Sequence, residues 1–154
     1  MKRWGFLMAL LLIVLGACGL EAEDPSNATI DESVPPNVMI MTSNESYNMM
    51  QGGYKWTVEG RKKGEQKTTI ADVASPPNQV LAGEKLTTIA KSETLALHFV
   101  VEPDRYKLYG WYEDGSKISI DDLEQLKGDE PVAIEVFADY PQGHASYVLP
   151  VQFE

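Results

Sequence analysis

The side chains that most often carry catalysis are scarce in this chain. It has two histidines, His98 and His144, and no HExxH, GxSxG or SxxK motif. An enzyme would have to combine one of these histidines with distant carboxylates for acid–base or metal chemistry. His98 falls on the strand face opposite Leu97 and Phe99, beside Ala96 and Val100, and is expected to be wholly or partly buried. His144 is expected in a solvated turn after Gly143. We therefore predict no catalytic residue, no metal site and no cofactor.

A second set of candidate residues consists of aromatic side chains in one predicted strand, 106–112. Tyr109 and Trp111 project from one side of this strand, and Tyr106 and Tyr112 project from the other. In a two-sheet domain one side of a strand packs into the core, which leaves the other pair at the surface. Because surface aromatic residues often mark recognition sites, Tyr109 and Trp111 are the candidate binding residues for a partner.

The single cysteine, Cys18, follows an N-terminal targeting segment. Lys2 and Arg3 supply positive charge, and residues 4–17 are almost entirely apolar. A helix of this length spans about 21 Å, which is less than the ~30 Å hydrocarbon core of a bilayer. This length is typical of a cleaved signal peptide, which we place at residues 1–17, and not of a permanent membrane span.

The residues before the cysteine suggest its chemistry. Leu15-Gly16-Ala17-Cys18 resembles the lipobox of bacterial lipoproteins, in which small residues precede an obligatory cysteine. The resemblance implies that the Cys18 thiol accepts a diacylglyceryl group, and two acyl chains suffice for stable anchoring. The alternative is an ordinary signal peptide that contains a cysteine by chance. We expect an extracytoplasmic protein held at the cell membrane by fatty acids, such as palmitate, on Cys18.

Residues 18–36 are predicted to form a disordered tether. They are rich in Glu, Asp, Ser, Pro and Asn and contain no aromatic residue, so they cannot bury enough apolar surface to become ordered. Removal of Lys2 and Arg3 with the signal changes the formal charge from −10 to −12. Phosphate groups repel a protein this acidic, which excludes nucleic acid as a partner and means that anionic headgroups alone would not hold it at a membrane.

Short β-strands must position the candidate residues. From residue 37 to residue 154, β-branched and aromatic runs alternate with Gly, Pro, Asn and Asp, as in all-β domains. Seven to nine antiparallel strands with Greek-key connections would form one two-sheet sandwich, with Trp56 and Tyr54 in its core. We expect one helical turn at 121–127, a hairpin turn at Asp114-Gly115, and strands over 38–41, 54–59, 66–70, 86–90, 94–101, 106–112, 117–120, 132–139 and 146–153.

Several segments resemble a module found in small extracytoplasmic lipoproteins of Gram-positive bacilli. They are Gly53-Tyr54-Lys55-Trp56, followed by Ala71-Asp72 and Ser75-Pro76-Pro77, and the ending Tyr140-Pro141-Gln142-Gly143-His144-Ala145-Ser146-Tyr147. The resemblance covers residues 50–154 and implies an immunoglobulin-like sandwich. Because most such modules are uncharacterised, it implies a fold and a compartment but no catalytic residues.

Together these features predict a lipid-anchored, non-enzymatic domain that binds a protein or another envelope component at the outer face of the membrane. Two alternatives stay open. A cell-envelope hydrolase or metal-assisted enzyme using His98 or His144 needs a histidine within ~3 Å of Asp, Glu or Ser at the base of a cleft. A small-ligand-binding lipoprotein needs an apolar pocket of ~300 Å³ or more.

Overall fold

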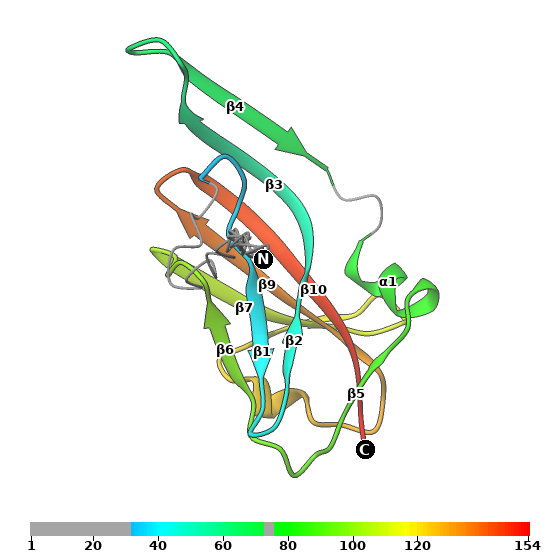
Figure 1. Ribbon diagram of the computed structural model, residues 1–154. Coiled ribbons are helices and arrows are strands. Elements are labelled where there is room, and N and C mark those ends of the chain that lie inside the picture. Colours follow the sequence, from blue (N-terminus) through cyan, green and yellow to red (C-terminus); the bar gives the residue numbers. More distant parts are fainter. Residues whose placement is uncertain (1–31, 73–75) are drawn as a thin grey trace, which may run out of the picture.

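Two β-sheets packed face to face make up the domain (Figure 1). The computed structural model describes residues 32–72 and 76–154. The predicted signal peptide, Cys18 and residues 19–31 of the predicted tether lie outside the described residues. The sequence-based prediction of an all-β sandwich is confirmed.

The described residues form ten strands, one α-helix and one 3₁₀ helix. The helices are α1 (Pro77–Gly83) and η2 (Leu123–Leu126). The predicted strands and the predicted helical turn are present, with ends shifted by a few residues. The additional strand is β2, a short polar segment that pairs with β1. The strands are β1 (Val38–Met41), β2 (Ser46–Asn48), β3 (Met50–Glu59), β4 (Gln66–Ala71), β5 (Thr87–Ile89), β6 (Ala96–Phe99), β7 (Arg105–Trp111), β8 (Lys117–Ile120), β9 (Val132–Tyr140) and β10 (Gly143–Phe153).

The smaller sheet has the order β2-β1-β6, and the larger one has the order β4-β3-β10-β9-β7-β8. β5 adds to the larger sheet by pairing in parallel with the end of β10, while the other strand pairs of the described residues are antiparallel. The predicted Asp114-Gly115 hairpin joins β7 to β8. Gly115 has φ +84°, and the Ser116 N–H donates to the Asp114 side chain.

One apolar core fills the space between the sheets. β1 contributes Val38 and Ile40, which are fully buried, and β9 and β10 contribute alternate residues along their whole length. Trp56 is 3% exposed and lies edge-on to Tyr140, with ring centroids 5.4 Å apart. Its predicted core position is confirmed, and Tyr54 lies half-buried against the same core.

The short helix α1 was not predicted, because its seven residues are too few for a helical repeat to emerge. Pro77, at its first turn, has the backbone angle that a helix start requires. Leu81 packs with Ala133 and Val148 on the outer side of the larger sheet, and Trp111 lies at the edge of this contact. The helix therefore covers one half of that outer face and leaves the other half open.

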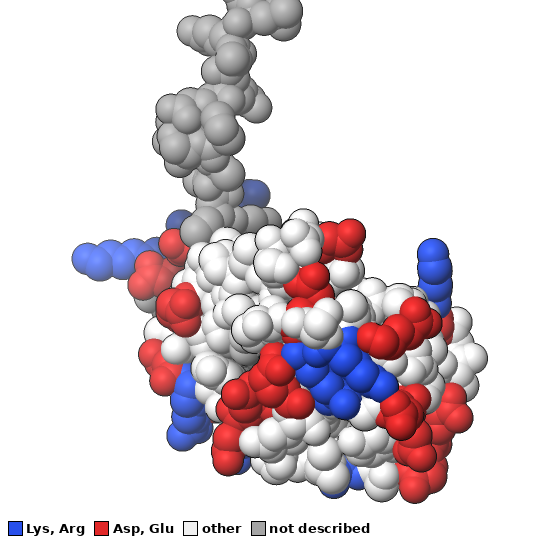
Figure 2. Space-filling view, turned by 90° about the horizontal axis from the view of Figure 1, so that it is seen from below, with Lys and Arg blue, Asp and Glu red and all other residues white. Residues whose placement is uncertain are grey.

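Ion pairs close the end of the sandwich seen from below in Figure 2, where acidic side chains surround a small group of basic ones. The Glu124 carboxylate accepts the Leu95 N–H at 3.1 Å and pairs with the Lys127 ammonium. These two contacts, the Lys127 one foremost, lower the pKa of Glu124. Lys127 also donates to the Glu93 carbonyl, so η2 is tied to the segment before β6.

At the opposite end, β10 begins where two backbones nearly touch. Gly143 has φ +151°, and a Cβ there would lie 1.9 Å from the Lys55 carbonyl oxygen. We expect Gly143→Ala to lower the free energy of unfolding in urea by about 2 kcal/mol or more, because β10 must separate from β3. The control Gly83→Ala, where no atom lies within 4 Å of the added Cβ, should not lower it. Equal stability of the two variants would contradict this close approach.

Candidate binding face

The open half of the outer side of the larger sheet carries Tyr109 and its neighbours. Strand pairing places Tyr109 opposite Glu135, and Lys107 opposite Phe137. Side chains alternate along each strand, so these residues point away from the sandwich core. We call this surface the outer face and define it by Lys55, Arg105, Lys107, Tyr109, Lys117, Glu135, Phe137, Asp139, His144 and Ser146.

Four side chains form a cluster at the edge of the outer face nearest α1. The Trp111 indole N–H donates to the Glu135 carboxylate at 2.7 Å, and the Lys117 ammonium lies 3.4 Å from the same oxygen. That ammonium also lies 3.6 Å from the Tyr109 ring centroid and 4.6 Å from the Trp111 ring. A cation held over two rings and beside a carboxylate fixes all four side chains in place.

The two predicted binding residues have different surroundings. Trp111 packs against the apolar contact between α1 and the sheet and gives its one donor to Glu135, so much of its surface is used within the domain. Tyr109 is half-buried and borders an open groove. On the other side of β7, Tyr112 packs against the core, and Tyr106 lies at the rim, 48% exposed and next to Phe99.

Two open hollows meet on the outer face at Glu135 and Phe137. One, of about 460 Å³, lies over β7 and β9 and is bordered by Tyr109. The other, of about 410 Å³, lies over β3, β9 and β10 and is bordered by His144. The Phe137 ring stacks on the His144 ring with centroids 5.4 Å apart and an angle of 27° between the planes. These adjoining hollows share Glu135 and Phe137 on their borders, and we call the two together the groove.

The sequence reading did not select Phe137, His144 or Lys117 as binding residues. One observation pointed to Phe137: it alternates with the core residues of β9 and therefore had to lie on the opposite side of that strand. No comparable pattern links His144 or Lys117 to Phe137 and Tyr109, because strand pairing between distant segments brings them together.

Both predictions for the histidines were wrong. His98 is exposed, because it lies on the outer side of the smaller sheet, which no other described element covers. His144 is part of β10 and pairs with Asp139, because the turn between β9 and β10 is short enough for strand pairing to resume at Gly143. Neither histidine hydrogen-bonds to an Asp, Glu or Ser within residues 32–72 and 76–154. The same residues hold no group of three His, Cys, Asp or Glu side chains placed to bind a metal ion.

A smaller hollow of about 250 Å³ lies at the end of the sandwich where the described chain begins. Residues 32–36, which we call the N-terminal strap, border it together with Trp56 and Tyr140. Hydrogen bonds hold the strap, among them those from the Trp56 indole to the Glu32 carbonyl at 2.9 Å, from the Tyr147 hydroxyl to the Pro36 carbonyl at 2.8 Å and from the Gln51 side-chain amide to the Pro35 carbonyl at 3.4 Å.

The hollow under the strap offers little polar chemistry. The buried Tyr140 hydroxyl has no hydrogen-bond partner among the described residues, and its burial raises its pKa. The Tyr147 hydroxyl also has a raised pKa, again because it is buried. The hollow is below the ~300 Å³ typical of small-molecule sites. Within residues 32–72 and 76–154, no helix has the length and apolar character needed to cross a membrane.

The different surroundings of the two aromatic residues can be measured separately. Trp111→Ala should lower the free energy of unfolding by about 2 kcal/mol, because it leaves a cavity beside α1 and deprives Glu135 of a donor. Tyr109→Ala should lower it by less than about 1 kcal/mol, because that ring borders the open groove. Urea unfolding followed by circular dichroism compares the two. A larger loss for Tyr109→Ala than for Trp111→Ala would contradict these assignments.

Among known proteins, the chain matches no family model, no curated sequence and no solved structure.

Proposed function

We propose that this chain is a lipid-anchored extracytoplasmic protein whose β-sandwich domain binds a protein or another envelope component, without catalysis, through its outer face. One observation carries the binding part of the proposal: Tyr109, Phe137 and His144 border two adjoining hollows on the sheet, and α1 leaves that half of the sheet open. The anchoring part is supported by the lipobox-like residues that end in Cys18.

Rings held on strands are suited to recognition. Phe137 stacks on His144, and Lys117 lies over Tyr109. These contacts already restrict the side chains that a partner would otherwise have to immobilise on binding. Binding then loses less conformational entropy, so a modest contact area can give useful affinity. The groove is wide and open and crosses several strands, so an extended partner, such as a protein surface or a polymer chain, fits it better than a small molecule.

The charges of the outer face favour a partner with acidic or polar groups. Arg105 pairs with Asp139 at 2.7 Å, and Lys117 pairs with Glu135. Lys107 lies between them, is exposed, and forms no ion pair within the described part of the chain. It is therefore available to a partner, on the face of a protein that is otherwise strongly acidic.

The two alternative functions have less support. Neither histidine hydrogen-bonds to a carboxylate or a serine among the described residues, which an enzyme of the kind considered above would need. A small-ligand carrier would have to use the hollow under the N-terminal strap, whose 250 Å³ leaves room only for a very small apolar molecule.

The outer face can be tested in living cells. We expect the double variant Tyr109→Ala/Phe137→Ala to lose about tenfold or more of the partner captured by crosslinking, because both changes remove rings from the groove. Tyr106→Ala removes an exposed aromatic residue from the other side of β7 and should leave capture unchanged. If the double variant is folded by circular dichroism and captures as much as the parent, the outer face is not the binding surface.

The anchor can be tested independently. Cys18→Ser removes the thiol that would carry the acyl chains, so the protein should leave the membrane fraction and lose incorporation of labelled palmitate. Ser26→Ala, a change of similar size in the predicted tether, should keep both. Palmitate labelling of the Cys18→Ser variant would show that the acyl chains are attached elsewhere.

A further inference from the structure

The hairpin formed by β3 and β4 extends beyond the rest of the sandwich (Figure 1). Pairing of β3 with β10 ends at Trp56, whereas its pairing with β4 continues to Glu59 opposite Gln66. The connecting loop is closed by hydrogen bonds from the Gly60 N–H to the Glu65 carbonyl, at 2.7 Å, and from the Glu65 N–H to the Lys62 carbonyl, at 2.9 Å. The projecting end is therefore an ordered two-stranded ribbon, exposed along both sides.

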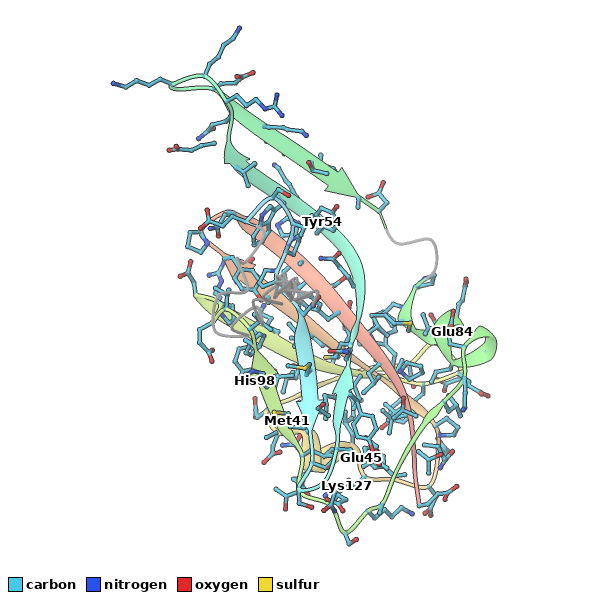
Figure 3. The ribbon with its side chains drawn as sticks, in the orientation of Figure 1. Met41, Glu45, Tyr54, Glu84, His98 and Lys127 are labelled. Carbon is cyan, nitrogen blue, oxygen red and sulfur yellow. The ribbon has the colours of Figure 1, made fainter. Side chains whose placement is uncertain are left out.

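This end carries a concentration of positive charge. We call residues 59–67 the basic tip; it holds four of the eleven basic residues that follow the predicted signal, and only two acids, Glu59 and Glu65. The four cations are exposed, and none forms an ion pair within the described residues. Nitrogen-tipped side chains point into solvent from this end in Figure 3. The cations are Arg61, Lys62, Lys63 and Lys67.

The basic tip and the N-terminal strap lie at the same end of the domain. The strap is fixed to Trp56 through the Glu32 carbonyl, and β3 runs on from Trp56 towards the tip. In a chain anchored upstream of the strap, as proposed above, the tip would lie at the end of the domain nearer the anchor. Lys127 and Glu45, labelled in Figure 3, mark the opposite, acid-rich end.

The tip lies far from the acid-rich end of the domain. The ten residues of β3 span about 33 Å, whereas charges in physiological salt are screened beyond about 8 Å. A surface next to the tip therefore responds to the local charge of the tip, which is +2, more than to the carboxylates of the opposite end.

We propose that the basic tip docks on anionic lipid headgroups and orients the domain, with its acid-rich end away from the bilayer. The proposal rests on the membrane anchoring proposed above. Attraction of one cation to an anionic leaflet favours contact by about fivefold, so a net of two favours it by about 25-fold. Since an anchor keeps the domain near the surface, contact is intramolecular, and this modest preference is enough.

Lysine acetylation read by mass spectrometry tests the docking. The full chain is bound to vesicles of phosphatidylcholine alone or of phosphatidylcholine mixed with phosphatidylglycerol. We expect acetylation of Lys62, Lys63 and Lys67 to fall about tenfold or more on the anionic vesicles only, and to recover at high salt. Lys85, which follows the Glu84 labelled far from the tip in Figure 3, should react equally on both. Equal acetylation of the tip lysines on both vesicles would overturn the proposal.

Two further experiments identify what protects the tip lysines from acetylation. Lys62→Gln/Lys63→Gln should abolish protection of Lys67, whereas Lys85→Gln/Lys107→Gln, which also removes two exposed cations, should preserve it. Soluble polyphosphate should protect the tip less than anionic vesicles do; stronger protection by the polymer would make it the partner and overturn lipid docking. Membrane anchoring is measured separately, by the release of the Cys18→Ser variant from the membrane fraction. A chain that is anchored but whose tip lysines are acetylated equally on both vesicles would therefore contradict docking and leave anchoring intact.

Discussion

The pairing of β10 with its neighbours is the constraint on which every surface of the domain depends. β10 pairs with β9 from Gly143 to Val151, with β3 over its first half and with β5 over its last three residues. Pro150 falls between the stretches that face β3 and β5, so its missing N–H leaves both pairings intact. Through these pairings, one strand fixes the outer face, the position of the β3–β4 hairpin and the parallel strand that leads from α1.

Along β10, the outer side of the larger sheet divides into a half that α1 covers and a half that is open. At the middle of β10, Val148 lies under α1 together with Leu81 and Trp111. Near its start, His144 and Ser146 border the groove. Trp111 lies at the boundary between the two halves. Its ring packs at the edge of the contact between α1 and the sheet, and its N–H donates to Glu135, so its main role is to hold Glu135 in place beside the groove. Aromatic residues two positions apart on one strand thus serve different purposes.

The sequence predicted what alternation and turn chemistry determine locally. Strands β1, β7, β8 and β9, the Asp114-Gly115 turn and the helical turn η2 all follow from such patterns. The exposure of His98 and the strand position of His144 could not be read in this way, because they depend on which layers cover a sheet and on where a turn ends. Phe137 could have been placed on the outer face from its alternation, but its stacking on His144 depends on pairing across the hairpin.

Net charge is a poor guide to how this protein meets a charged surface. The carboxylates are spread over most of the domain, and several are used in ion pairs that close the end opposite the hairpin, as Glu124 and Asp129 are. The cations of the hairpin tip form no ion pair within the described part of the chain, and they lie several screening lengths from that opposite end. An anchored chain samples only a thin layer of solution next to the bilayer, so the charge that matters is the charge of the end that faces it. In the proposed docking, a strand pair that continues past its sheet would give an acidic domain a basic contact with the surface beneath it.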